Sequence, residues 1–443
     1  MDKFSFLNAA HTGFIADLYE QYLINPDAVE PSWRSFFQGY DLANENYSLT
    51  DEEETSTEIP EEVRKEFLVI DLINGYRTRG HLFTKTNPVR ERRKYAPSLE
   101  IENFGLTQND LATVFNAGDI LGIGPKSLAE IIQHLENIYC NSIGVEYMYL
   151  RNPEELKWWQ NRLNANDNSP KYNSDSKKYI LQKVNQAVGF ESFLQTKYVG
   201  QKRFSLEGGE ALIPGLSVLL RDAAEKYGVK ECVLGMAHRG RLNTLVNIFK
   251  KPVRELFNEF EGKDFEDEDL DGDVKYHLGL TLSKTYKNGN SIKMNLVPNP
   301  SHLETVDGVA EGIVRAKIDK KYNGDDSKIL PILVHGDAAI AGQGIVYEVI
   351  QMAKLNGYKT GGTVHVVVNN QVGFTTNYLD ARSSTYCTDI AKVTLSPVLH
   401  VNADDVEAVC HAMEMAIEFR TKFKRDIFID LLGYRKYGHN EGD

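Results

Sequence analysis

The feature that most constrains the fold is the alternation of short apolar runs with helical patterns between residues 179 and 443. Five apolar runs recur there: ECVLGMA, KILPILVHG, GTVHVVVNN, PVLHVNA and DIFIDLLGY. Helical patterns lie between them, such as GIVYEVIQMAKLNGY, closed by Gly357, and DVEAVCHAMEMAIEFRTKFKR, opened by Asp404 and Asp405. Continuous apolar strands separated by helices are typical of a parallel sheet covered on both faces. The sequence therefore predicts an α/β domain with a doubly wound parallel sheet over residues 179–443.

Residues 1–44 are predicted to form two short amphipathic helices. Their apolar faces are Phe14, Ile15, Leu18 and Tyr22, followed by Trp33, Phe36, Phe37 and Tyr40. Residues 45–62 are acidic and nearly free of large aliphatic side chains, which predicts a disordered linker. The helices are therefore tethered, and two interpretations stay open: they dock on their own protein, or they form an arm that docks on another protein.

Residues 63–178 read as a small, all-helical region that precedes the α/β domain. Val63, Phe67, Ile70 and Ile73 share one helical face, and a second helical stretch, LAEIIQHLENIY, follows a turn that ends at Pro125. Residues 164–178 are polar, lack apolar periodicity and predict a surface loop, which gives the boundary before residue 179.

Charge and composition exclude several classes of protein. The formal net charge of -13 argues against nucleic acid or an anionic membrane as the main partner, because phosphate binding draws on clustered Lys and Arg. No uncharged apolar run approaches the roughly 20 residues that a membrane span needs. The four cysteines form no CxxC pair, and the first 20 residues show neither a secretory signal nor a transit peptide. We expect a cytoplasmic, bacterial protein.

Polar residues follow two of the predicted strands, and these carry the strongest chemical signal. One strand ends in Gly336 and Asp337, and the next ends in Asn369 and Asn370. Ligands of open parallel sheets bind beyond the carboxyl ends of the strands, where strand order reverses. One carboxylate, one amide oxygen and the carbonyl of Val372 would give Mg²⁺ three oxygen ligands, and substrate phosphates would complete its octahedral shell. Gly336 permits a close approach of the backbone, and the helix that follows directs its positive end to a diphosphate.

This spacing resembles the thiamine diphosphate motif, a Gly-Asp-Gly followed some thirty residues later by Asn-Asn. Ala338 stands at the third position, which departs from the general pattern. The fuller strings resemble the 2-oxoglutarate dehydrogenase E1 family: HGDAA, VVVNNQVGFTT, GMAHRGRLN, FSLEGGE, NPSHLE and YRKYGHNEGD. The opening FLNAAHTGFIADLYEQY is similar to that family as well. The resemblance thus covers nearly the whole chain and implies the thiamine diphosphate-binding fold.

The resemblance also implies roles for individual residues. Asp337, Asn370 and the carbonyl of Val372 hold Mg²⁺, and Ala338 and Ala339 lie against thiamine diphosphate. Arg239 lies near the diphosphate or the substrate, and Ser301, His302 and Leu303 line the same pocket. His238 and His302 are the catalytic candidates, with the family role of holding the dicarboxylate substrate and early intermediates. Read without the family, a lone histidine after an apolar strand is more often structural, and that reading is kept for His277, His365 and His411.

By the same resemblance, the chain is part of an enzyme of the tricarboxylic acid cycle that decarboxylates 2-oxoglutarate and passes the succinyl group to lipoamide. Its implied partners are dihydrolipoyl succinyltransferase (E2), dihydrolipoyl dehydrogenase (E3) and, at full length, a second copy of the chain. The sequence ends at GHNEGD directly after a predicted strand, so we expect a truncated chain that is inactive alone, because the aminopyrimidine-binding half is missing. The alternative is a noncatalytic module that binds E2 or cofactor.

Overall fold

The computed structural model describes residues 12–29, 33–34, 36–38, 40–41, 60–90, 95–261 and 275–441. The chain divides into two compact units, Met1–Pro60 and Glu61–Asp443, each described here by itself. Most of the predicted linker, residues 45–59, lies outside the described residues.

The first unit packs its aromatic side chains on one another. Helix α1, Thr12–Ile24, is followed by a short 3-10 helix, Pro26–Ala28, which Asn25 caps by accepting a hydrogen bond from Asp27 N. Tyr22 and Phe37 are buried, with ring centroids 5.3 Å apart. The predicted apolar faces therefore meet within this unit as far as it is described, and its role as a docking arm remains a prediction.

The second unit contains an eight-stranded sheet in the order β3-β11-β12-β8-β7-β4-β6-β5. Neighbours from β11 to β6 run parallel, whereas the two edge strands, β3 and β5, are antiparallel to their neighbours. The strands are β3 (Ile143–Glu146), β4 (Glu231–Met236), β5 (Leu280–Thr285), β6 (Ser291–Leu296), β7 (Ile329–Gly336), β8 (Val364–Asn369), β11 (Val398–Asn402) and β12 (Ile427–Leu432). All five predicted strands are confirmed, and β3, β5 and β6 join them.

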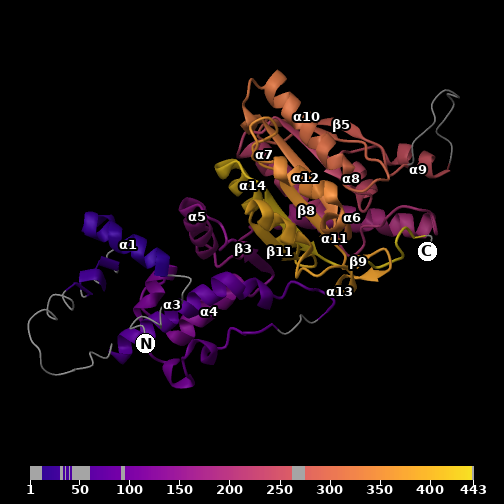
Figure 1. Ribbon diagram of the computed structural model, residues 1–443. Helices are drawn as coiled ribbons and strands as arrows, with labels where there is room; N and C mark the ends of the chain where they lie inside the picture. The colour runs from indigo at the N-terminus through magenta and orange to yellow at the C-terminus, as the bar shows by residue number, and fades with distance from the viewer. Residues whose placement is uncertain are drawn as a thin grey trace, which may run out of the picture. The chain divides into compact units, whose positions relative to one another are not determined.

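Helices cover both faces of this sheet (Figure 1). Alternate residues of its buried strands therefore pack into different hydrophobic layers. Leu234 packs on the side of α7 and α14, whereas its neighbour Val233 packs on the side of α10. Asp405 caps α14 as predicted, accepting from Ala408 N at 3.0 Å. The helices are α6 (Ser174–Lys197), α7 (Leu212–Glu225), α8 (Arg241–Asn247), α9 (Val253–Glu261), α10 (Thr305–Lys321), α11 (Asp337–Gly342), α12 (Gly344–Met352), α13 (Tyr378–Ala381) and α14 (Val406–Phe423). Among the described residues, none of these helices combines the length and the apolar character needed to span a membrane.

The region 63–178 is largely helical, with α3 (Glu61–Arg79), α4 (Leu128–Tyr139) and α5 (Pro153–Asn164). It is not purely helical, because β3 pairs with β11 and the short strands β1 (Val114–Phe115) and β2 (Lys126–Ser127) pair with each other. The boundary expected before residue 179 falls inside α6, so the helical region and the α/β region share one sheet and one compact unit.

The order of strands reverses next to β4. From β4 the chain passes to β5 and β6 on one side, then to β7 on the other. The parallel pairing places the carboxyl ends of β4, β7 and β8 at one edge. This edge is where open α/β sheets bind ligands.

Candidate functional site

Asp337 and Asn370 follow neighbouring parallel strands. Gly336 is in register with Val368, so Asp337 begins α11 close to the point where Asn370 follows β8. Asp337 is buried, and its Oδ2 lies 3.9 Å from Arg382 Nη1, beyond hydrogen-bond distance. Burial raises the pKa of Asp337 to about 6, while Arg382 acts in the opposite direction. A buried carboxylate whose charge is only partly compensated fits the prediction of a bound cation.

The turn after Asn370 lies against the other half of the motif. Asn370 Oδ1 accepts a hydrogen bond from Val372 N at 3.2 Å, and Gln371 adopts a left-handed conformation with φ of 64°. Val372–Gly373 forms the short strand β9, which pairs with β10, Thr376–Asn377. A Cβ added to Gly373 would lie 2.7 Å from Ala338 Cβ. The structure thus brings together both halves of the predicted motif, including the nonstandard Ala338.

His238 lies just beyond the end of β4 and pairs with a second histidine. Its Nε2 is 3.0 Å from Nε2 of His277, so one imidazole donates a hydrogen bond to the other. Burial, followed by repulsion from His277, lowers the pKa of His238 to about 4. His238 is therefore neutral near pH 7 and can accept or donate a hydrogen bond.

His277 is the functional candidate that the sequence reading missed. The sequence favours a structural role for His277, because 38 residues separate it from His238 and nothing in that spacing signals a contact. In the structure, Ser301 Oγ lies 3.4 Å from His277 Nε2, so His277 bridges two of the predicted residues.

The loop that carries Ser301, His302 and Leu303 precedes α10, and all three side chains are exposed. The carbonyl of His302 accepts from Thr305 Oγ1 at 2.8 Å. In the described part of the chain, no hydrogen bond or ring contact joins His302 to His238. A shared pocket for these two residues therefore remains a prediction. The next residue, Glu304, is buried, and its Oε2 lies 2.6 Å from Nδ1 of His335 on β7.

Arg239 links three of the sequence motifs named above, GMAHRGRLN, FSLEGGE and YRKYGHNEGD. Its guanidinium donates to the carbonyl of Ser205 at 2.8 Å and to that of His439 at 2.9 Å. Burial lowers the pKa of Arg239 to about 10, and the carboxylates of Glu441 and Asp337 oppose this shift. The charge of Arg239 is therefore held at the edge of the sheet where Asp337 lies.

Comparison with known proteins gives two family matches. Residues 182–443 match the family described as dehydrogenase E1 component. Residues 4–44 match the family described as 2-oxoglutarate dehydrogenase N-terminus.

Three curated relatives are similar to this chain. The 2-oxoglutarate dehydrogenase E1 component of Azotobacter vinelandii is 43% identical over 99% of this chain and 48% of its own length. The same component from Cupriavidus necator is 42% identical over 99% of this chain and 48% of its own length. A multifunctional 2-oxoglutarate metabolism enzyme of Mycolicibacterium vanbaalenii is 49% identical over 85% of this chain and 31% of its own length. The chain thus spans about half the length of the first two relatives and a smaller share of the third.

Proposed function

The chain belongs to the dehydrogenase E1 component family, on the branch of 2-oxoglutarate dehydrogenase E1, and on this premise we propose that it supplies the diphosphate-binding part of such an enzyme. The observation that carries the proposal is the meeting of Asp337, Ala338 and the Asn370 turn at the carboxyl ends of β7 and β8, of which β7 neighbours β4. In this assignment, Asp337, Asn370 and the carbonyl of Val372 hold Mg²⁺, and the ion holds the diphosphate. Ala338 and Ala339 line the cofactor side of α11.

The assigned reaction is the oxidative decarboxylation of 2-oxoglutarate. Thiamine diphosphate, when bound, supplies the electron sink for loss of carbon dioxide. The residues of this chain have the tasks of binding and orienting. Asp337 compensates the charge of Mg²⁺, and Arg239 faces the diphosphate or a substrate carboxylate. His238, with His277 behind it, presents a neutral imidazole, and the mobile proton of the pair lets it donate to a carboxylate oxygen.

The second carboxylate of a dicarboxylate substrate explains why histidines are needed at this site. Burying the second carboxylate of 2-oxoglutarate requires donors that replace its water. We assign this role to His238 and His302, as the family resemblance implies, with Ser301 and Leu303 in the same loop. The succinyl group then passes to dihydrolipoyl succinyltransferase, and the complex includes dihydrolipoyl dehydrogenase and a second copy of the E1 chain. A noncatalytic module that binds E2 or cofactor remains the alternative.

Calorimetric titration with thiamine diphosphate, with and without Mg²⁺, tests the proposal. Asp337→Asn removes the anionic protein ligand of the ion, so binding of metal and cofactor should weaken together. Asp325→Asn is the matched control, because Asp325 caps a short helix at the amino end of β7, opposite the carboxyl ends that carry the site. Cofactor affinity that is unchanged in Asp337→Asn with Mg²⁺ present would overturn the assignment.

A further inference from the structure

We propose that residues 81–87 and the edge strand β3 are a positioning frame for the turn 369–372, holding it from both sides of Asn370. The frame belongs to the region that precedes the α/β part in sequence. The proposal rests on the proposed function, in which Asn370 and Val372 are ligands of Mg²⁺. In this proposal the residues of the frame do not touch the cofactor; they hold the turn that carries its metal ligands.

On one side of Asn370, a buried chain of hydrogen bonds starts at Asn369. Asn369 Nδ2 donates to Asp430 Oδ1 at 2.9 Å, and Asp430 Oδ2 lies 2.9 Å from His400 Nδ1. His400 Nε2 lies 2.9 Å from Glu146 Oε1 on β3. Four strands, β8, β12, β11 and β3, each contribute one of these residues, so the chain of bonds crosses the sheet from the predicted metal site to its edge.

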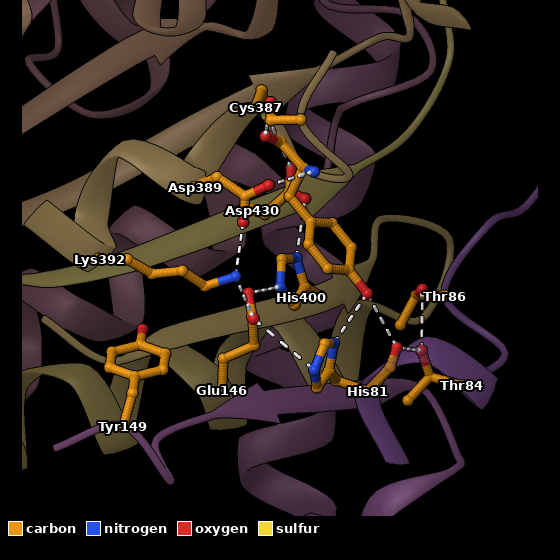
Figure 2. Close-up of polar contacts among 12 residues, drawn as sticks. His81, Thr84, Thr86, Glu146, Tyr149, Cys387, Asp389, Lys392, His400 and Asp430 are labelled. Atoms are coloured by element: carbon orange, nitrogen blue, oxygen red, sulfur yellow. Dashed lines mark hydrogen bonds and ion pairs between the residues drawn. The ribbon is translucent and has the colours of Figure 1, made fainter. Parts of the chain in front are cut away.

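The frame closes at His81, in the 3-10 helix Gly80–Phe83 (Figure 2). Glu146 Oε2 lies 3.6 Å from His81 Nε2 and accepts from Lys392 Nζ at 2.7 Å. Nδ1 of His81 is 2.9 Å from the hydroxyl of Tyr386, whose ring stacks on His400 with centroids 3.7 Å apart.

On the other side of Asn370, the same segment holds Gln371 directly. Asn87 Nδ2 donates to Gln371 Oε1 at 2.8 Å, and Gln371 Nε2 donates to Asn87 Oδ1 at 3.1 Å. Gln371 Nε2 also donates to the carbonyl of Gly433 at 2.7 Å. These bonds hold a non-glycine residue in its left-handed conformation, which costs free energy without such support.

The charges along this path favour a fixed structure. Burial opposes ionisation of Glu146, but His400, His81 and Lys392 together lower its pKa to about 2. Burial also disfavours the charged form of His400 and so lowers its pKa, but its hydrogen bonds to Asp430 and Glu146 outweigh burial and raise the pKa overall. An imidazolium that donates from both ring nitrogens to two buried carboxylates has one favourable orientation. His81, Glu146 and His400 could also hold a divalent ion by their spacing, but Lys392 already compensates Glu146 in the structure.

Exchanging the polar groups at Asn369 and Asp430 tests the frame. Asp430→Asn presents an amide donor where an acceptor is needed, either to Asn369 or to His400. The double variant Asn369→Asp with Asp430→Asn restores complementarity, because the new amide at position 430 then donates to the new carboxylate at position 369 and accepts from His400. The first readout is the amide exchange rate of Gln371 and Val372, whose N–H groups donate to Asn369 Oδ1 and Asn370 Oδ1. Exchange should accelerate about tenfold or more in the single variant and return toward the parent rate in the double variant.

The second readout is binding of Mn²⁺ with thiamine diphosphate, followed by electron paramagnetic resonance. Groups that orient metal ligands typically change metal affinity about 10- to 100-fold, and we expect this range for Asp430→Asn, with recovery in the double variant. If the parent chain binds no Mn²⁺ in the presence of the cofactor, the proposed function fails, while amide exchange still decides whether the frame holds the turn.

A milder variant guards against misfolding. Asn87→Asp keeps the oxygen that accepts from Gln371, Val89 and Arg90 and loses only the donation to Gln371. Asn152→Asp is the matched control, because Asn152 caps α5 and, in the described part of the chain, makes no hydrogen bond to the turn. Weaker Mn²⁺ binding and faster exchange in Asn87→Asp alone support the frame. Parent behaviour in both Asn87→Asp and Asp430→Asn, or equal losses in Asn152→Asp, would overturn it.

Discussion

Gly373 lies against Ala338 so closely that a Cβ added to Gly373 would be 2.7 Å from the Cβ of Ala338. A Cβ atom essentially never lies within 3.0 Å of a heavy atom of a residue that is not its neighbour in the chain. The alanine that departs from the Gly-Asp-Gly pattern is therefore matched by a glycine on the opposite loop. Together, these residues set the distance between the two halves of the motif.

Gly373→Ala should push these halves apart and weaken binding of thiamine diphosphate, by about tenfold if the displaced loop loses one metal contact. Adding Ala338→Gly to this variant removes the clash and should restore affinity. Gly342→Ala is the control, because nothing lies within 4 Å of an added Cβ there. Calorimetry with Mg²⁺ present measures all three, and a double variant as weak as the single one would contradict this account.

The contact between Glu304 and His335 predicts a pH dependence of stability. Burial disfavours the imidazolium, but Glu304 and Asp307 outweigh it and raise the pKa of His335 from 6.5 to about 9. A raised pKa stabilises the folded state fully below pH 6.5, and this contribution is lost as the pH rises to about 9. At pH 6.5 the parent should therefore have a higher free energy of unfolding than Glu304→Gln, by at most about 3 kcal/mol. This difference should disappear as the pH rises to about 9. Urea unfolding at pH 6, 7.5 and 9 measures the difference; a difference independent of pH would refute the assignment.

Removing residues 1–44 should leave the folding of the second unit unchanged, because the two units are separately compact. In the proposed complex, the deletion should abolish copurification with dihydrolipoyl succinyltransferase. Phe37→Ala is a subtler test, since Phe37 is buried within the first unit, and it should weaken copurification without changing the unfolding midpoint of the second unit. Retained copurification of the deletion variant would show that these helices serve another purpose.

The His238–His277 pair should act as one group in the full-length enzyme. Alanine at either position should reduce kcat/KM for 2-oxoglutarate far more than for a monocarboxylic 2-oxo acid, and the double variant should lose little more than each single variant. His302→Ala should likewise reduce kcat/KM for 2-oxoglutarate, because the proposed function assigns it to the same carboxylate as His238. Equal losses on both substrates would assign the histidines to the end shared by all 2-oxo acids.

The five central strands were predictable because burial on both faces leaves continuous apolar runs. The edge strand β5 was not, since its residues alternate between half-buried and exposed and contain no apolar run. β3 has four residues, and only its pairing with β11 makes it a strand. Short segments whose conformation depends on distant partners carry little local signal.

The same distinction applies to the site. The placement of Asp337, Asn370 and Val372 after neighbouring strands was predictable, because strand ends and turn chemistry are local in sequence. The pairing of His238 with His277 was not, because 38 residues separate them and nothing in that spacing signals a contact. The path from Asn369 to Glu146 was equally hidden, since His400 and Glu146 are 254 residues apart in sequence.

Strand β3 also has a consequence for the order of synthesis. A ribosome completes residues 143–146 long before it makes their neighbour, β11, and a domain generally folds as a unit during synthesis. Two of the three groups that lower the pKa of Glu146, His400 and Lys392, are also made long after it. Until β11 has been made, residues 143–146 therefore lack the partner that makes them a strand, and the early helical region completes its fold only after that point.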